Sequence, residues 1–272
     1  MKYKRTVRLP PLPLQPHPRP THPQLLAGMW NDFVNAKKRM QSEGPFLLEH
    51  LPSHKKVFDA ALGTGADSIF LLQNGYEVTG NEIDRYFRGV ANANLLKAGL
   101  GMPITEYDWL TMDSDTKKGS FDAVICLGNS LTYISNRQDQ GRVLANFIRI
   151  LRPGGVLILD TRNYDYMLDE SMAILNNGSF NYSGNYVYCG TNLVHAKPVA
   201  ISDSEITMEY KHIRTKKKAY LYLYPFRRIE LRGRLQQAGF ADIKFFSDYE
   251  PRLDKYADFH QFVCMRPCLP TF

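Results

Sequence analysis

The chain has 272 residues, of which 44% are hydrophobic and 12% aromatic. This length and composition predict one large globular domain, or one domain with a substantial insertion, and exclude a disordered or collagen-like chain. No apolar run has the length of a membrane span, and the basic N-terminus lacks the apolar segment of a secretory signal, so we expect a cytoplasmic protein without membrane contact. Four cysteines, with no two pairs at metal-ligand spacing, predict neither a disulfide scaffold nor a metal site.

The net charge of +7 comes largely from the N-terminal tail. Residues 1–20 contain five basic and no acidic residues, which leaves 29 basic and 27 acidic residues in the rest of the chain. Seven prolines between positions 10 and 23 predict an extended, poorly ordered segment. The tail is either an arm that touches RNA or a membrane, or a solvated leader. We favour the leader and expect no nucleic-acid partner, because the body is nearly neutral and no aromatic or glycine residues alternate with the basic residues of the tail in the way that suggests a base-stacking surface.

The chain after the tail predicts an alternation of strands and helices. Apolar residues at helical spacing predict a helix over 25–34, and Gly44-Pro45 would interrupt the helical region before a short turn at 46–51. From residue 57 onward the pattern is typical of βαβ units in a doubly wound α/β fold with a mostly parallel, seven-stranded sheet. The predicted strands are 57–62, 76–81, 104–107, 121–127 and 156–159, and the predicted helices are 67–74, 84–100 and 141–151.

The pattern changes after residue 160. Residues 163–225 are rich in Tyr, Asn, Thr and Ser, with β-favouring runs at 186–188, 205–213 and 219–224, and we interpret them as an inserted antiparallel lid. A helix over 228–238 and strands at 243–246 and 259–265 return to the α/β pattern, and the last two strands can form an antiparallel edge. The predicted division is a tail (1–23), a core (24–162), a lid (163–225) and a C-terminal part of the core (226–272).

The sharpest local signal is the segment DAALGTGAD at 59–67. A strand that runs into Gly-x-Gly and then a helix brings the backbone close to a ligand at the carboxyl edge of a sheet. Glu82 ends the next predicted strand, 19 residues after Gly63. A carboxylate there can accept hydrogen bonds from both hydroxyls of a ribose. The spacing therefore predicts a site for a nucleoside.

Two nucleoside ligands are compatible with this turn. NAD sites usually have a third glycine where this chain has Ser68, and Asp67 at the start of the following helix would repel a pyrophosphate. Asp59 and Asp67 suit a ligand with an ammonium group, such as S-adenosylmethionine, although the helix dipole alone would also favour Asp67. The residues favour S-adenosylmethionine and leave NAD as the alternative.

Four segments carry a family resemblance. They are VFDAALGTGADSIFLLQNGYEVTGNEID (57–84), FDAVICLGNSLTYI (121–134), LRPGGVLILDTRNYDYML (151–168) and YPFRRIELRGRLQQAGF (224–240). They resemble class I S-adenosylmethionine-dependent methyltransferases, and more narrowly the glycine N-methyltransferases and the glycine/sarcosine and sarcosine/dimethylglycine methyltransferases. The run from Arg162 to Asp165 is the most specific part, and the resemblance extends from Trp30 to Pro267.

The resemblance implies where S-adenosylmethionine binds. In that family the glycine turn surrounds the methionine end, an acid holds the ribose, two residues after the third strand flank the adenine, and a backbone segment passes near the sulfonium. A tryptophan of the N-terminal helix closes over the cofactor, and a basic residue pairs with its carboxylate. Arg39 is our choice for that residue, with Lys38 as the alternative. The glycine turn would comprise Asp59, Ala61, Gly63 and Gly65, and the acid that holds the ribose would be Glu82. Asp108 and Trp109 would flank the adenine, and the backbone of Leu127 would pass near the sulfonium. The tryptophan would be Trp30 and the basic residue Arg39.

The resemblance also implies the substrate, a small amino acid of the glycine, sarcosine or dimethylglycine type. Arg162 would grip its carboxylate with a bidentate guanidinium, or else cap the strand end in a structural ion pair. Asn129 would hydrogen-bond the substrate, and three tyrosines of the insertion would line its cavity: Tyr188, Tyr210 and Tyr224. Tyr133 stands where the animal enzyme has histidine, which puts its role in doubt.

Other functions remain open at this level. The chain could methylate another small carboxylated amine or another small molecule, or bind S-adenosylmethionine without catalysis. An RNA or protein methyltransferase would need a basic body, which this chain lacks. Of these functions, that of a NAD-dependent oxidoreductase is the least compatible with the sequence of the glycine turn.

Overall fold

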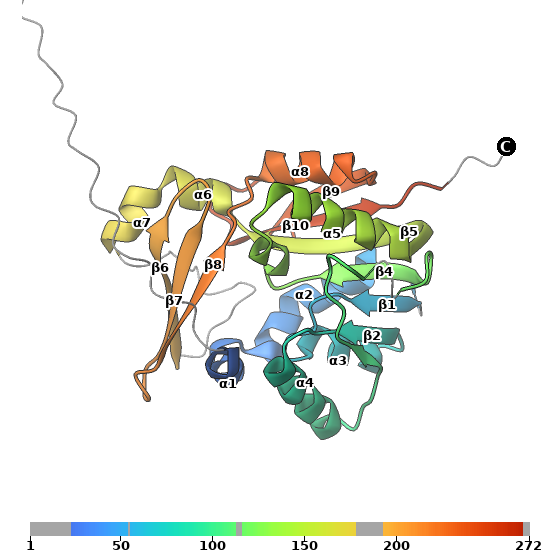
Figure 1. Cartoon of the computed structure of the whole chain (residues 1–272), viewed down its shortest axis with the longest axis horizontal. Helices are drawn as coiled ribbons and strands as arrows, with labels where there is room; N and C mark the ends of the chain where they lie inside the picture. Colours follow the sequence, from blue (N-terminus) through green and yellow to red (C-terminus); the bar gives the residue numbers. More distant parts are fainter. Residues whose placement is uncertain (1–22, 54, 113–115, 178–192, 269–272) are drawn as a thin grey trace, which may run out of the picture.

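The computed structural model describes residues 23–53, 55–112, 116–177 and 193–268. Within these residues the chain forms a seven-stranded sheet of order β3-β2-β1-β4-β5-β10-β9 and a separate three-stranded sheet (Figure 1). β1 to β5 are parallel, and β10 runs antiparallel to both β5 and β9. The strands of the large sheet are β1 (Lys56–Asp59), β2 (Glu77–Asn81), β3 (Ile104–Thr105), β4 (Phe121–Cys126), β5 (Leu151–Arg162), β9 (Ala241–Ser247) and β10 (Phe259–Met265).

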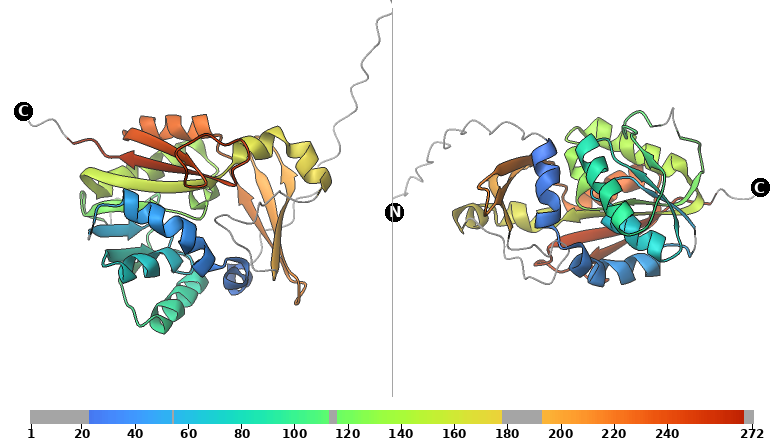
Figure 2. Two further views of the ribbon diagram at one scale, coloured as in Figure 1. Left: turned by 180° about the vertical axis from the view of Figure 1, so that it is seen from behind. Right: turned by 90° about the horizontal axis from the view of Figure 1, so that it is seen from below.

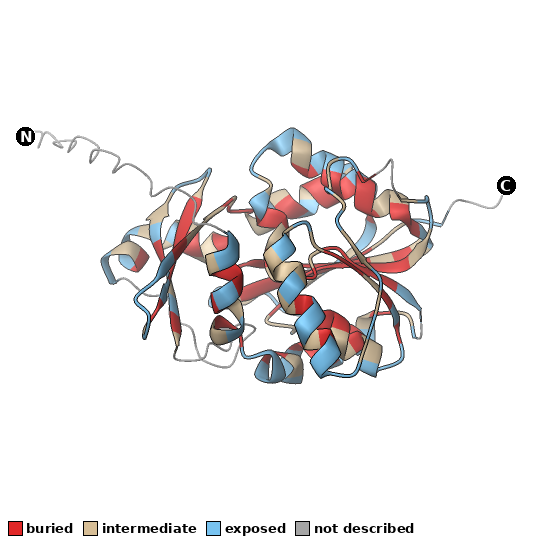
Figure 3. Cartoon of the chain, turned by 60° about the horizontal axis from the view of Figure 1, so that its bottom comes forward, coloured by how far each residue is buried: buried red, intermediate tan, exposed pale blue. Residues whose placement is uncertain are grey.

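Helices cover both faces of the large sheet, which is why its central strands are continuous apolar runs. Phe46 and Leu47 of α2 pack with Val57 and Ile125 on one face, and α5 and α8 bury their apolar residues on the other. Figure 3 shows the buried residues concentrated in the strands and on the inward sides of the helices. The helices are α1 (Pro23–Phe33), α2 (Ala36–His50), α3 (Ala66–Gln73), α4 (Arg85–Lys97), α5 (Arg137–Ile150) and α8 (Arg228–Gln237). The doubly wound α/β prediction is confirmed.

The prediction that Gly44-Pro45 interrupts the N-terminal helices is wrong. The interruption lies at Asn35, whose side-chain oxygen accepts a backbone N–H three residues later at 3.1 Å and caps α2. Pro45 lies inside α2 with its ring exposed. Gly44 is required by packing, because a Cβ atom there would lie 2.6 Å from the ring of Phe70 in α3.

The start of β5 also differs from the prediction. The strand begins at Leu151 and continues through Pro153-Gly154-Gly155, whereas the predicted strand begins at residue 156. The register between β4 and β5 shifts there. Gly155 fits this irregular stretch because a Cβ atom would lie 2.9 Å from the Arg152 carbonyl oxygen and 3.0 Å from that of Asp122.

The predicted insertion contains an antiparallel sheet of order β6-β7-β8 and two short helices. The runs at 205–213 and 219–224 correspond to β7 and β8, whereas β6 and both helices were not predicted, and the run at 186–188 lies outside the described residues. α1 packs against both α4 and β6 and so lies between the two sheets (Figure 2). These elements are α6 (Tyr164–Asp169), α7 (Ser171–Asn177), β6 (Val194–Ile201), β7 (Ile206–His212) and β8 (Lys218–Leu223).

None of the helices in the described part of the chain is long and apolar enough to cross a bilayer. The predicted tail at residues 1–22 lies outside the described residues.

Candidate active site

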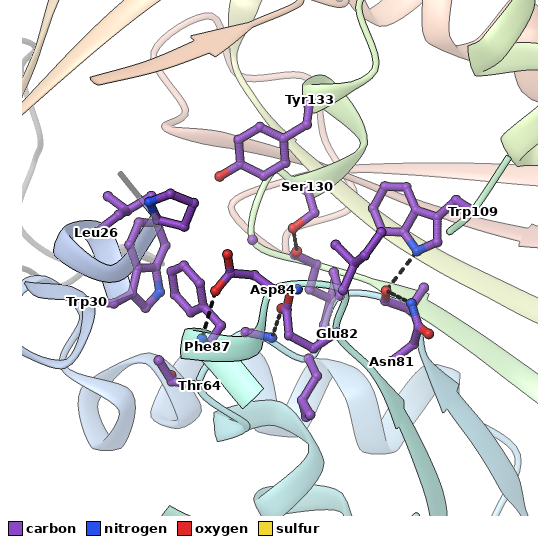
Figure 4. A pocket seen from close by; sticks show the side chains of 18 of the residues that line it. Leu26, Trp30, Thr64, Asn81, Glu82, Asp84, Phe87, Trp109, Ser130 and Tyr133 are labelled. Atoms are coloured by element: carbon purple, nitrogen blue, oxygen red, sulfur yellow. Dashed lines mark hydrogen bonds between the residues drawn. The ribbon is translucent and has the colours of Figure 1, made fainter. Parts of the chain in front are cut away.

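A cavity of about 570 Å³ opens where the carboxyl ends of β1, β2 and β4 meet. α1 and β8 close it from the side of the small sheet. Figure 4 shows Trp30 from α1, Phe87 from α4 and Tyr133 from the short helix η1 (Ser130–Tyr133) projecting into it. Eight of the ten positions expected to contact the cofactor line this cavity: Trp30, Arg39, Ala61, Gly63, Glu82, Asp108, Trp109 and Leu127.

The glycine turn after β1 is fastened to the end of β2 by Glu82. Its Oε2 accepts the backbone N–H of Gly63 at 3.0 Å, and its Oε1 accepts that of Asp84 at 2.9 Å. Gly63 has φ +54, a left-handed conformation that glycine adopts without strain. Burial raises the pKa of the Glu82 carboxyl above its ordinary value, against the opposing effect of these two N–H groups. Each oxygen keeps a second lone pair, so the carboxylate can still accept ligand hydroxyls.

The opposite wall is built by Trp109. Its Nε1 donates to the carbonyl of Ala60 at 2.9 Å, and its own carbonyl accepts Asn146 Nδ2 at 2.8 Å. Asn81, which the sequence analysis did not single out, holds the neighbouring loop. Its Oδ1 accepts the N–H of Tyr107 at 2.8 Å, and its Nδ2 donates to the Tyr107 carbonyl at 3.1 Å. The indole ring and this loop thus form one side of the cavity.

Of the two basic candidates in α2, Arg39 faces the cavity and Lys38 is exposed. Arg39 Nη2 donates to Asp67 Oδ2 at 3.1 Å, and Arg39 Nε donates to Glu43 Oε2 at 2.6 Å. Burial raises the pKa of Glu43 to about 8, while Arg39 opposes this effect. Asp67 Oδ1 is buried at the cavity wall and has no hydrogen-bond partner in the described part of the chain. A ligand ammonium group would satisfy it.

Asp59 and Gly65 do not line the cavity. Asp59 lies behind the turn, where its carboxylate accepts the Ser68 hydroxyl at 2.6 Å and the Ala61 N–H at 3.2 Å. Burial, and then the charge of Asp67, raise the pKa of Asp59 to about 7. Gly65, with φ +84, is the N-cap residue that directly precedes α3. Both residues shape the turn from the side away from the cavity. They do not surround the ligand site directly, as the sequence had led us to expect.

Three of the five residues expected on the substrate side lie together at the end of β5. Asn129 Oδ1 accepts the backbone N–H of Arg162 at 3.0 Å, and the Arg162 side chain donates to the Tyr210 hydroxyl. Arg162 is only 4% exposed, with its guanidinium carbon 5.2 Å from the ring centroid of Phe259. Tyr210 in turn packs on Trp30, with ring centroids 6.0 Å apart. Arg162 therefore lies beside the cavity rather than in its lining.

The other two expected substrate residues lie elsewhere. The Tyr224 hydroxyl donates to Glu230 Oε1 of α8 at 2.8 Å, so its side chain points away from the cavity. Tyr188 lies outside the described residues.

The Asn129 side chain is occupied by hydrogen bonds to Tyr164 and Arg162, so it supports the site instead of facing the cavity.

Sequence reasoning missed several cavity residues of the small sheet. Tyr220, Leu221 and Tyr222 of β8 line the cavity, and Tyr220 also donates to Glu209 Oε2 at 2.9 Å. The tyrosines at every second position of the predicted strand 219–224 could have indicated that one face of this strand lines a cavity. Tyr133, whose role was in doubt, also faces the cavity.

Comparisons with known proteins identify the family. The sequence matches the family model described as "Methyltransferase domain" over residues 57–155. It is 34% identical over 223 residues to the glycine/sarcosine N-methyltransferase of Aphanothece halophytica, covering 81% of this chain and 80% of that protein. This chain is a class I S-adenosylmethionine-dependent methyltransferase related to the glycine/sarcosine N-methyltransferases.

Two further comparisons agree with this assignment. The methyltransferase is 36% identical over 160 residues to the glycine N-methyltransferase of Rattus norvegicus, which covers 54% of this chain and 55% of that one. Its fold resembles the crystal structure of a S-adenosylmethionine-dependent methyltransferase from Clostridium acetobutylicum ATCC 824, with a TM-score of 0.68, 18% identity, and coverage of 89% of this chain and 98% of that one. The predicted family, fold and cofactor are confirmed, and NAD is no longer an alternative cofactor.

The cavity of this methyltransferase fits its cofactor. Its charged lining among the described residues comprises one guanidinium, from Arg39, and four carboxylates. Such a surplus of acids suits a ligand with a sulfonium and an ammonium group, and the unpartnered oxygen of Asp67 lies on the same wall. The carboxylates belong to Asp67, Glu82, Asp84 and Asp108.

Proposed function

We propose that this methyltransferase N-methylates a small amino acid of the glycine or sarcosine type. The observation that carries the proposal is the buried guanidinium of Arg162, which lies at the carboxyl end of β5 beside the cavity and hydrogen-bonds Tyr210. A bidentate guanidinium is well suited to a carboxylate, because its planar donors match the two carboxylate oxygens. The names of the relatives from Aphanothece halophytica and Rattus norvegicus point to the same class of substrate.

In this proposal, different cavity residues bind different parts of the cofactor. Glu82 would accept the ribose hydroxyls, and Trp109 with Asp108 would flank the adenine. Asp67 and Arg39 would receive the ammonium and carboxylate of the methionine end, next to the glycine turn. Leu127 and Trp30 would enclose the region between, and Asp59 and Gly65 would act from behind by shaping the turn.

The bound cofactor supplies a methyl group already activated by its sulfonium. The remaining task of the protein is to orient an unprotonated amine nitrogen in line with that methyl group. Arg162 would fix one end of the amino acid, and Asn129 and Tyr164 would hold Arg162 in place through its backbone. Tyr133 and the β8 residues Tyr220 and Tyr222 would exclude water around the nitrogen.

The test is methyl transfer from labelled S-adenosylmethionine to glycine, sarcosine and dimethylglycine in separate reactions. We expect label in N-methylated product with at least one of them, and the pattern reports how many methyl groups the nitrogen can already carry. No transfer to any of the three, with cofactor binding intact, would contradict the proposal. It would point to another carboxylated amine, which a panel of small amino acids would reveal, or to binding without turnover.

A further inference from the structure

A strained turn between β9 and β10 directs a tyrosine toward the cofactor side of the sheet. Asp248 and Tyr249 both have left-handed backbone, with φ +50 and +71, which residues with side chains rarely adopt. The Tyr249 N–H donates to Gln261 Oε1 at 2.9 Å, and the Asp248 carboxylate accepts the N–H groups of Asp258 and Phe259. The surrounding contacts thus hold the turn in an unfavourable conformation, and this determines where the Tyr249 ring points.

The Tyr249 side chain reaches α2. Its ring packs on Phe46, with centroids 5.2 Å apart, and its hydroxyl donates to Glu43 Oε2 at 2.9 Å. Glu43 is 0% exposed and also accepts Arg39 Nε at 2.6 Å on Oε2 and Arg39 Nη2 at 3.0 Å on Oε1. Three donors therefore converge on one fully buried carboxylate.

The same guanidinium continues to the cavity. Arg39 Nη2 also donates to Asp67 Oδ2 at 3.1 Å, and both Arg39 and Asp67 line the cavity. The other oxygen of Asp67 is buried without a hydrogen-bond partner in the described residues. A continuous path of hydrogen bonds thus runs from Tyr249 through Glu43 and Arg39 to the wall where a ligand ammonium would bind.

A buried ion pair of this kind is a poor device for stability alone. Apolar residues of similar volume often serve a core as well or better, because desolvating two charges offsets their attraction. The arginine side chain is long and can adopt many rotamers. Asp160, which is 1% exposed, is a further buried carboxylate near Arg39. Without Glu43 the guanidinium would have other buried acids to approach. Holding Arg39 in one orientation is the role that this arrangement performs.

We propose that Glu43 and Tyr249 are positioning residues that hold Arg39, and through it Asp67, in the geometry that binds the amino-acid end of the cofactor. Neither residue touches the cavity. The proposal rests on the S-adenosylmethionine family and on the division of the cofactor proposed above, but not on which amine is methylated.

The test compares two ligands in direct binding by calorimetry. S-adenosylhomocysteine carries the amino-acid end, and methylthioadenosine shares its nucleoside and sulfur but lacks that end. The variants are Tyr249→Phe and Glu43→Gln. The matched controls are Tyr256→Phe, at a 71% exposed tyrosine of the same β9–β10 connection, and Glu49→Gln, at an exposed position of the same helix.

We expect Tyr249→Phe to raise the Kd of S-adenosylhomocysteine about fivefold and Glu43→Gln to raise it more than tenfold, with methylthioadenosine and both controls within twofold of the wild type. If a methylated amine has been found, the KM for S-adenosylmethionine should rise while kcat changes little. Equal weakening of both ligands would indicate a merely structural role and overturn the proposal, as would unchanged affinity. If Glu43→Gln does not fold, Tyr249→Phe decides. The binding result stands even if no amine is methylated.

Discussion

The amide Nδ2 of Asn129 donates to the hydroxyl of Tyr164 at 2.8 Å, across the boundary between the parallel sheet and the small-sheet segment. Asn129 itself has left-handed backbone with φ +65, directly after the loop that follows β4. Its Oδ1 simultaneously accepts the N–H of Arg162. One buried side chain thus connects the end of β4, the end of β5 and α6, and so controls where Arg162 emerges from the sheet.

Replacing Asn129 separates its backbone role from its side-chain role. Asn129→Gly keeps the left-handed backbone and loses the side-chain hydrogen bonds, so we expect the free energy of unfolding to fall by about 2 kcal/mol. Asn129→Ala adds backbone strain of about 1 kcal/mol to that loss. Urea denaturation of both variants measures the difference. Equal stability of the two variants would show that the left-handed backbone costs nothing here.

Glu82 should control affinity for the nucleoside. Glu82→Gln replaces one of the two acceptor oxygens that hold the Gly63 and Asp84 N–H groups with a donor. We expect the Kd of S-adenosylhomocysteine and of methylthioadenosine to rise together, each by about tenfold or more. Calorimetry measures both. Glu77→Gln, at the exposed start of the same strand, is the matched control and should leave both affinities unchanged.

Arg162 should control affinity for the amino acid. Arg162→Lys keeps the charge and loses the planar fork, so we expect the KM for the amino acid to rise at least tenfold while the KM for S-adenosylmethionine stays within twofold. Steady-state kinetics with each substrate varied in turn gives both values. Arg152→Lys, near the other end of β5, serves as the control. An unchanged amino-acid KM in Arg162→Lys would remove the carboxylate assignment and leave Arg162 as a structural residue.

His260 should make the fold sensitive to mild acid. Its ring is 2% exposed in β10, its Nε2 has no hydrogen-bond partner in the described residues, and burial lowers its pKa from 6.5 to about 4. The folded state therefore favours the neutral ring. The associated stability is fully present above the unfolded-state pKa and is lost as the pH falls from about 6.5 toward 4.

The measurement is urea denaturation of the wild type and of His260→Leu at pH 7.5 and pH 5. The wild type should lose about 2 kcal/mol more than the variant between these two pH values. The leucine should be tolerated, because the ring packs against Phe245, with centroids 4.9 Å apart. Parallel losses in the two proteins would show that His260 is not the group that titrates.

Much of this protein followed from its sequence alone. Apolar runs, helical spacing and glycine breaks are local properties, so they predicted the strand-helix alternation and the doubly wound sheet. The glycine turn and Glu82 were also predictable, because parallel strands bring their carboxyl ends to one edge and 19 residues is the length of one strand-helix-strand step. The family resemblance added the cofactor, which the comparisons confirm.

Only the tertiary structure decided how side chains from distant segments meet. Tyr249 and Glu43 are 206 residues apart, and nothing in local periodicity relates them. The choice of Arg39 over Lys38 depended on which side of α2 faces the cavity. Local sequence determines the elements through backbone propensity and hydrophobic period. The partners of a buried charge are set by packing between elements, because burial makes their pairing energetically necessary.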